Sequence, residues 1–508
     1  MTSAAATTTR STNVTGPTSR AGTLRTNAIA MFLGQFATWG LTALTLMLLP
    51  RYLGPERMGQ MSIGMSFAVL TVTVAGLGMD TLIIRDIARD RAATARRLGT
   101  AVWLHLLLGV AGAAVAFAVA TGAGYATETR IAIALSVATV PFLMLSAVGI
   151  GVLQGVEVMR HQAIWNTFTK AALLGSLLLV MALDLGLFPL LALVLVWEAV
   201  SAGGLLLSAY RQVPFPLRTF SLPDARYLVV ASLPFFTVGI FVVLYVAVDV
   251  LQLSLLAGET AVGIYSAPSR IFGTMLFVPT IIITVAFPQM AADFRNDRAR
   301  LVQMCRSTLR LVLAFVVPLA VLAVGLSGDI LVTVIGEGFA GSGPVIAMLG
   351  LSLIPTSVLI ITHRIMVATD RQNTWTVVMF VALVAKVGLN FVLVPAFEGW
   401  FGNAALGAAT SLVAVESVLM VSTFWLLPRG VVDREAALFY ARLAIAAAVG
   451  AVTMMSLAPI GWFVAGGAGA VAYGAVALAT RAHSVAEVIG GARIALGRVT
   501  PAGPVDAC

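Results

Sequence analysis

Long apolar stretches, separated by short polar segments, run along nearly the whole chain. A membrane-crossing helix needs about 20 predominantly apolar residues, and stretches of roughly that length recur between residues 27 and 480. They lie at 27–49, 60–84, 98–120, 130–153, 167–186, 188–209, 228–256, 263–288, 311–327, 343–363, 374–396, 403–427, 438–457 and 460–480. The pattern therefore predicts an all-α polytopic membrane protein with about 14 transmembrane helices.

Composition agrees with this interpretation. The chain is 59% hydrophobic and 10% charged, with a mean hydropathy of +0.99, a balance that soluble globular domains do not have. A net charge of +9 would suggest nucleic acid as a partner of a soluble protein. In a membrane protein it is typical of Arg-rich cytoplasmic loops, so we expect no nucleic-acid partner. Cys305, in a predicted cytoplasmic loop, and Cys508, at the C-terminus, predict neither a disulfide nor a metal site.

The positions of the basic residues predict the orientation. With the N-terminus in the cytoplasm, 25 of the 31 Lys and Arg residues fall in cytoplasmic segments and three in outer loops. The remaining three, Lys170, Arg270 and Lys386, fall inside predicted spans. This asymmetry predicts cytoplasmic termini and an even number of spans. The outer loops are short, which leaves no outer domain to carry catalysis.

Two outer turns resemble each other at an offset of 204 residues. Gly54 aligns with Gly258, Gly59 with Gly263, and Ser62 with Ser266. Each turn follows an odd-numbered span, and each second helix enters a cytoplasmic loop with five arginines. We therefore expect two parallel six-helix lobes, spans 1–6 and 7–12, with two extra C-terminal helices. The predicted parts are a disordered cytoplasmic tail at 1–26, an N-terminal lobe at 27–209, a cytoplasmic linker at 210–227, a C-terminal lobe at 228–427, two additional transmembrane helices at 438–480 and a cytoplasmic tail at 481–508.

Asp249 and Arg270 are a candidate site because they fall at matching depths on two consecutive predicted helices. Charged residues inside a membrane are costly unless they pair or line a wet cavity. One interpretation is a structural ion pair. The other is that Arg270 meets an anionic cargo, since guanidinium suits phosphate and carboxylate, while Asp249 holds Arg270 or takes a coupling proton or Na⁺.

Lys386 and Glu416 form a second expected pair, central in spans 11 and 12. Asn390, one helical turn after Lys386, extends the same polar face, so cavity lining and structural pairing are both open interpretations. Glu198 is the acid at mid-depth in the first six spans and a candidate for ion coupling; a protonated, hydrogen-bonded carboxyl group is the alternative. Lys170, one turn inside span 5, is expected to extend to the cytoplasmic interface.

Several segments carry a resemblance to a known family. Leu53-Gly54-Pro55-Glu56, followed by Gly59, and the run from Gly76 to Asp90 look like the start of polysaccharide-transporter proteins. Asp249, the run from Ala261 to Ala267, and Arg270 resemble the seventh and eighth helices of the same family. This family of O-antigen and oligosaccharide flippases belongs to the multidrug/oligosaccharidyl-lipid/polysaccharide flippase superfamily.

The resemblance implies a non-enzymatic carrier in the plasma membrane of a bacterium or archaeon. Its cargo would be a glycan linked to isoprenoid pyrophosphate, moved by alternating access between two lobes. The implied partners are this lipid-linked glycan, membrane lipids, H⁺ or Na⁺ as a coupling ion, and a polysaccharide polymerase; no cofactor or metal is expected.

Three alternative functions stay open. A cation-coupled multidrug antiporter of the superfamily is expected to have an acid in span 1, which here offers Asn27 and Gln35. A lipid II flippase is expected to have a basic cluster in span 1, and that cluster is missing. An integral-membrane glycan polymerase needs catalytic groups on a sizeable outer loop. The sequence also lacks a phosphate-binding glycine loop, a nucleophile elbow and a Cys/His cluster, which disfavours ATP hydrolysis by this chain.

Overall fold

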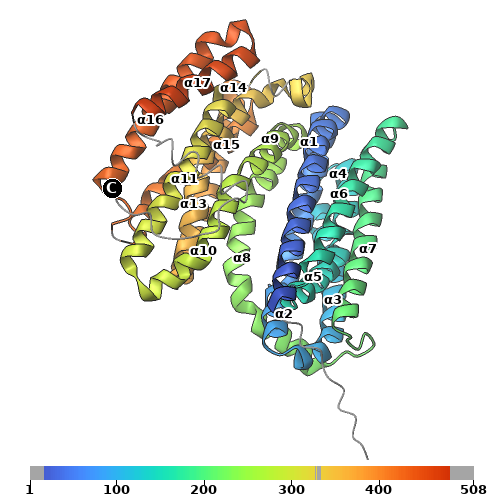
Figure 1. Ribbon diagram of the computed structural model, residues 1–508. Helices are drawn as coiled ribbons and strands as arrows, with labels where there is room; N and C mark the ends of the chain where they lie inside the picture. The colour runs from blue at the N-terminus through green and yellow to red at the C-terminus, as the bar shows by residue number, and fades with distance from the viewer. Residues whose placement is uncertain (1–16, 326–327, 329–332, 429, 481–508) are drawn as a thin grey trace, which may run out of the picture.

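The computed structural model describes residues 17–325, 328, 333–428 and 430–480. Its regular structure in these residues is entirely helical, as predicted (Figure 1). The first helices are α1 (Pro17–Gly76), α2 (Met79–Arg89), α3 (Arg91–Gly122), α4 (Thr127–Val137), α5 (Val140–Gly155), α6 (Met159–Ala182) and α7 (Leu187–Gln212). They are followed by α8 (Leu222–Leu256), α9 (Gly258–Met275), α10 (Phe277–Asn296), α11 (Arg298–Gly325), η1 (Glu337–Ser342), α13 (Gly343–Ala368), α14 (Gln372–Phe401), α15 (Ala404–Phe424), α16 (Arg434–Leu457), η2 (Ala458–Ile460) and α17 (Trp462–Ala479).

Twelve helical stretches in the described residues are long and apolar enough to cross a membrane, and Val464–Ala479 is a shorter apolar helix. The first stretch, Gly40–Gly76, contains the non-helical residue Gly54, with φ 71° and ψ 174°. Dividing this stretch at Gly54 and adding the shorter helix makes fourteen, the number that hydropathy predicts.

The chain reverses direction at Gly54. Thr45 and Met65 line the same cavity, although a straight helix would separate residues twenty positions apart by about 30 Å. Gly54 and its counterpart Gly258 both adopt positive φ, a region that glycine enters without a steric penalty. The two residues that the offset of 204 aligns therefore have the same backbone role in the two hairpins.

Several predicted spans are interrupted. The span expected at 60–84 ends at Gly76, and a break with positive φ at Leu77 and Gly78 precedes α2. The span expected at 130–153 is divided between α4 and α5, with Pro141 in the first turn of α5. Proline lacks an amide hydrogen and suits the first turn of a helix, so a new helix starts there.

Three expectations about the polar segments need correction. Residues 17–26 are helical rather than disordered, and Pro17 is the first residue of α1. The expected loop around Cys305 is part of α11, and Cys305 is fully buried among apolar side chains. The expected linker is shortened, because α7 continues to Gln212 and α8 begins at Leu222. The polar composition of these segments suggested loops, but the neighbouring helices continue into them. The remaining tail residues, 1–16 and 481–508, lie outside the described residues.

The helices form two bundles, with α1–α7 on one side of the view in Figure 1 and α9–α17 on the other. Helix α8 joins them. Its first turns contact the N-terminal bundle, where the Tyr227 hydroxyl donates to Asp86 at 2.8 Å and Arg97 lies 4.3 Å from the centre of the Tyr227 ring. Its later turns contact α14 in the C-terminal bundle, where Gln252 donates to the carbonyl oxygen of Val387.

The two turns at Gly54 and Gly258 bring the bundles into direct contact. A Cβ atom added to Gly59 would overlap the carbonyl oxygen of Glu259, and one added to Gly263 would overlap the carbonyl oxygen of Pro55. The two contacts are equivalent, since Pro55 and Glu259 are also 204 residues apart. Ser62 and Ser266 share a hydrogen bond of 2.9 Å beside them. We call this reciprocal contact of Pro55–Ser62 with Glu259–Ser266 the glycine seal.

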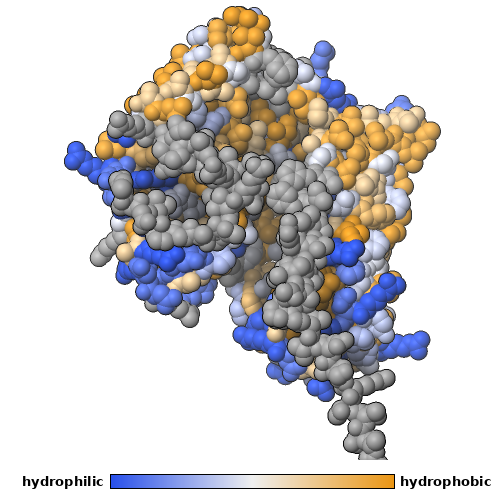
Figure 2. Space-filling model, in the orientation of Figure 1, coloured by the Kyte–Doolittle hydropathy of each residue, from blue (hydrophilic) through white to orange (hydrophobic). Residues whose placement is uncertain are grey.

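In the view of Figure 2, hydrophilic residues gather mainly toward the lower part of both bundles, and hydrophobic residues cover much of their upper part. The end that carries Arg85, Arg97, Arg226 and Arg298 is called the Arg-rich end below. The glycine seal lies at the opposite end, next to η1, where Gly338 approaches Pro55. This separation fits a molecule whose middle lies in a hydrocarbon layer.

Candidate functional site

Asp249 and Lys386 form a buried ion pair in the C-terminal bundle. The Lys386 Nζ lies 2.8 Å from Asp249 Oδ2, and each side chain is 2% exposed. Tyr265 donates its hydroxyl to Asp249 at 2.5 Å, and Lys386 also donates to the carbonyl oxygen of Tyr245 at 2.9 Å. Several hydrogen bonds offset the loss of hydration that a buried charge pair suffers.

Asn390 extends this cluster by one helical turn. Its Nδ2 donates to Asp249 Oδ1 at 3.0 Å and to Gln252 Oε1 at 2.9 Å. The ammonium group of Lys386 also lies 4.1 Å from the centre of the Tyr245 ring, a favourable cation–π position. Lys386 and Asn390 are thus enclosed between α8 and α14.

The expected pairing of Asp249 with Arg270 was wrong. The physical reason is the rotation of α9. Tyr265 points to Asp249, and Arg270 comes five residues later, about 140° further around the helix. Ser266, one turn before Arg270, contacts Ser62 of α1, and Arg270 itself lies 3.3 Å from the Met65 sulfur. Arg270 therefore faces the N-terminal bundle.

The expected pairing of Lys386 with Glu416 was wrong for a similar reason. Lys386 faces α8, whereas Glu416 on α15 is 4% exposed and accepts a hydrogen bond from the Thr356 hydroxyl on α13. Hydropathy assigned both residues the correct helices, but it carried no information about which faces of those helices meet.

Arg270 lines a cavity of about 360 Å³ inside the N-terminal bundle. Lys170 on α6 and Glu198 on α7 line the same cavity, together with Ser136 and Thr139. We call it the basic cavity. Among the described residues no salt bridge joins Arg270 to an acid, so its positive charge is not neutralised by direct contact with a carboxylate. A half-buried guanidinium beside a cavity is suited to receive an anion.

A second cavity, of about 600 Å³, continues from the basic cavity toward the turn between α5 and α6. The two share Leu143, Thr169, Lys170 and Glu198 in their linings. We call the second cavity the polar chamber. Lys170, which the sequence placed at the interface, thus lies where the two cavities join.

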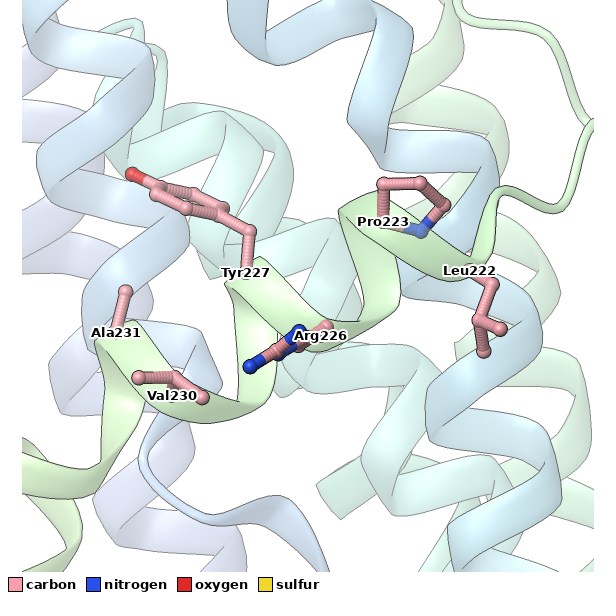
Figure 3. A pocket seen from close by; sticks show the side chains of 6 residues that line it. All are labelled: Leu222, Pro223, Arg226, Tyr227, Val230 and Ala231. Atoms are coloured by element: carbon pink, nitrogen blue, oxygen red, sulfur yellow. The ribbon is translucent and has the colours of Figure 1, made fainter.

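A third pocket lies at the Arg-rich end of α8 (Figure 3). Its volume is about 710 Å³, and Leu222, Arg226, Tyr227 and Val230 are among its lining residues. Arg226 supplies its one charged group, and the pocket involves residues of a single helix. The basic cavity combines Lys170 and Glu198 of the N-terminal bundle with Arg270 of the C-terminal bundle, and we take it as the candidate site.

Sequence reasoning missed several residues of these clusters. Tyr245, Asp249 and Gln252 recur at helical spacing on one face of α8, a signal that could have indicated the partners of Lys386. Tyr265 and Thr356 carried no such signal, because a single hydroxyl in a span is common. In the described part of the chain, no group of three or more His, Cys, Asp or Glu residues is placed to hold a metal ion.

Solved structures with the same fold are transporters and flippases. "Lipid II flippase MurJ, inward closed conformation" matches with a TM-score of 0.72 and 14% sequence identity, covering 89% of this chain and 99% of that one. An inward-facing multidrug resistance MATE family transporter of the MOP superfamily matches with a TM-score of 0.63 and 16% identity, over 77% and 93% of the two chains. A MOP superfamily transporter from Pyrococcus furiosus matches with a TM-score of 0.52 and 17% identity, over 78% and 93%. At these identities the likeness establishes that this chain shares the fold of these proteins, and it says nothing about what the chain carries.

Sequence comparison identifies the family. No curated protein matches the chain. The family described as "Polysaccharide biosynthesis protein" matches residues 24–292, which include both hairpin turns, Asp249 and Arg270. This match spans more than half of the 508 residues, and the chain therefore belongs to the polysaccharide biosynthesis protein family.

Proposed function

We propose that the protein is a flippase that moves a lipid-linked oligosaccharide or polysaccharide repeat unit across the plasma membrane. The carrier lipid is an isoprenoid pyrophosphate, and relative movement of the two bundles alternates access to the basic cavity, to which both contribute. Family membership and the fold shared with a lipid II flippase support this proposal. In this reading the protein is a carrier for cell-surface polysaccharide synthesis, and a polysaccharide polymerase receives its product.

The observation that carries the proposal is the position of Arg270. It comes from the C-terminal bundle and lines a cavity in the N-terminal bundle, without a salt bridge to an acid among the described residues. An arginine held in this way binds a pyrophosphate group by charge-assisted hydrogen bonds. Because both bundles contribute to the cavity, their relative movement changes the surroundings of a bound anion.

The charge of the cavity favours this cargo over a cationic drug. Arg270 and Lys170 face a single lining acid, Glu198. A cationic drug would require an excess of acids, whereas a pyrophosphate requires an excess of bases. Glu198 is our candidate for the group that takes a coupling proton or Na⁺. Asp249, whose charge is balanced by Lys386 at 2.8 Å, is the less suitable of the two.

The test is transport by purified protein in proteoliposomes that contain an undecaprenyl-pyrophosphate-linked trisaccharide. Exposure of the trisaccharide to an impermeant glycosidase measures its movement across the bilayer. Arg270→Ala should slow transport by about tenfold or more, because charge-assisted hydrogen bonds are the strong ones. Arg270→Lys should keep part of the rate, since charge is retained without the planar guanidinium.

The matched control is Arg218→Ala, which removes an exposed arginine in the segment between α7 and α8. Its transport rate should equal that of the wild type. Unchanged transport by a folded Arg270→Ala protein, or transport of ethidium in place of the trisaccharide, would contradict the proposed function.

A further inference from the structure

The polar chamber differs in chemistry from the basic cavity. Its lining contains the amides of Gln154, Gln162 and Asn166 and the hydroxyls of Ser146 and Ser201. The charged residues of its lining are Lys170 and Glu198, and both belong to the part that it shares with the basic cavity. An anion site and a neutral, hydrogen-bonding site therefore lie next to each other in one bundle.

The walls of the polar chamber are held by hydrogen bonds between helices. Gln154 on α5 donates its amide to Gln162 Oε1 on α6 at 3.1 Å. The hydroxyls of Thr38 on α1 and Thr167 on α6 lie 3.2 Å apart and close another side. Each amide and hydroxyl can form more than one hydrogen bond, so these groups keep donors and acceptors for a ligand.

Two buried hydroxyls on these linings have no hydrogen-bond partner in the described structure. Ser146 lines the polar chamber and is 7% exposed, and Ser136 lines the basic cavity and is 5% exposed. Buried polar atoms are nearly always satisfied, so an unpartnered hydroxyl beside a cavity is available to bind water or a polar ligand there. The two serines, ten residues apart on α4 and α5, indicate polar contacts in both cavities.

We propose that the polar chamber is a binding subsite for an uncharged sugar, the one attached directly to the pyrophosphate. This inference rests on the proposed function, in which Arg270 receives the pyrophosphate. Neutral amides and hydroxyls are the groups that pair with sugar hydroxyls, each of which both donates and accepts. The chamber volume of about 600 Å³ lies within the usual range of small-molecule sites.

The subsite also assigns a direction to the head group. Gln154 and Met159 flank the turn between α5 and α6, where Gly155 contacts Ile87 of α2 at the Arg-rich end. The pyrophosphate at Arg270 therefore lies deeper in the bundle than the first sugar. The rest of the glycan extends from the chamber toward the Arg-rich end.

The test compares three soluble probes on the purified full-length protein in nanodiscs. They are farnesyl pyrophosphate, the same pyrophosphate carrying one glucose, and the same carrying one glucuronate, with affinity measured by calorimetry. The glucosyl probe should bind about tenfold more tightly than farnesyl pyrophosphate, the gain expected from two or three net hydrogen bonds. The glucuronosyl probe should show no gain over the glucosyl probe.

The variants separate the sugar subsite from the anion site. Gln162→Leu together with Asn166→Leu should abolish the glucose-dependent gain and leave the affinity for farnesyl pyrophosphate unchanged. Ser146→Ala, a smaller change, should reduce the gain by severalfold. The matched control is Asn373→Leu, an exposed asparagine in the first turn of α14, which should keep the full gain.

Three outcomes would overturn the subsite. They are equal affinity of the wild type for the bare and glucosyl probes, a full gain retained by the Gln162/Asn166 double variant, or tighter binding of the glucuronosyl probe. In each of these three outcomes, a loss of affinity for farnesyl pyrophosphate in the Arg270→Ala variant would still support the proposed function. No binding of farnesyl pyrophosphate by the wild type, or no effect of Arg270→Ala on it, would overturn both.

Discussion

At the scale of single residues, the ionisable groups inside the bundles divide into two kinds. Lys386 and Asp249 satisfy each other, with Tyr265, Asn390 and the Tyr245 carbonyl completing their hydrogen bonds. Arg270 instead lines the basic cavity, and no comparable set of hydrogen-bonding partners surrounds it in the described residues. A buried, satisfied ion pair serves structure, whereas a base that faces open volume is available for a ligand.

The first prediction concerns Lys386. Lys386→Ala leaves Asp249 as an unpaired buried charge, which costs about 3–5 kcal/mol in comparable buried pairs. We therefore expect a clearly lower midpoint of thermal unfolding in detergent, followed by tryptophan fluorescence. Loss of transport in this variant would then be a consequence of the unstable fold.

The control is the double variant Lys386→Met with Asp249→Leu. Replacing both charges with apolar groups of similar volume is often neutral in stability, so the unfolding midpoint should recover. A double variant as unstable as Lys386→Ala would argue against the ion pair as the source of the loss. A stable double variant without transport would instead assign Lys386 or Asp249 a role in carrying cargo or coupling ion.

At the scale of helices, contact between the bundles depends on glycines, which have no Cβ atom. Apolar surface alone does not drive helices together in a membrane, because lipid is equally apolar, and small residues permit close approach. In the glycine seal, Gly59 and Gly263 bring α1 and α9 to backbone contact. The glycine seal lies at one end of the bundles, and the polar chamber extends toward the other.

The second prediction tests this seal with a matched pair of glycines on α9. A methyl group at Gly263 would overlap the Pro55 carbonyl, whereas Gly273 has open space around it. Gly263→Ala should lower the unfolding midpoint and slow transport, because the two backbones must separate. Gly273→Ala should leave both unchanged or raise stability by up to about 1 kcal/mol through helix propensity. Equal effects of the two changes would mean that the close contact has no energetic importance.

At the scale of the whole molecule, the Arg-rich end and the glycine seal mark opposite faces. The basic residues of α2, α3, α8 and α11 gather at one end, while both positive-φ hairpin turns lie at the other. An excess of Lys and Arg marks the cytoplasmic side of membrane proteins. We therefore propose that the Arg-rich end faces the cytoplasm.

The third prediction concerns this orientation. In a background with Cys305 and Cys508 replaced by alanine, a cysteine at Thr127 or Ala340 should react with an impermeant thiol reagent added outside. A cysteine at Ala92 should react only after the membrane is permeabilised. All three positions are exposed, so burial does not confound the comparison. The reverse labelling pattern would invert the assignment and place the polar chamber on the outer side.

The placement of elements along the chain followed from the sequence. Hydropathy identified the spans because a helix that crosses a bilayer must be apolar over a nearly constant length. The offset of 204 residues identified Gly59 and Gly263 as equivalent positions. In the structure, the backbones of the two hairpins approach each other closely at these two glycines. Helix boundaries were less certain where polar segments, such as residues 298–310, continued an adjoining helix.

What the sequence alone determined about this protein is its all-helical membrane fold, the depth of its buried charges and the resemblance to its family. Which charges meet was decided only by the tertiary structure. Asp249, Arg270 and Lys386 all lie in spans, yet Asp249 joins Lys386, 137 positions away, while Arg270 faces the other bundle. The reason is that the depth of a residue in the membrane depends on its position along the helix, whereas its contact partners depend on how the helix is rotated about its own axis. A helix that is apolar on all sides leaves that rotation to be set by packing against its neighbours.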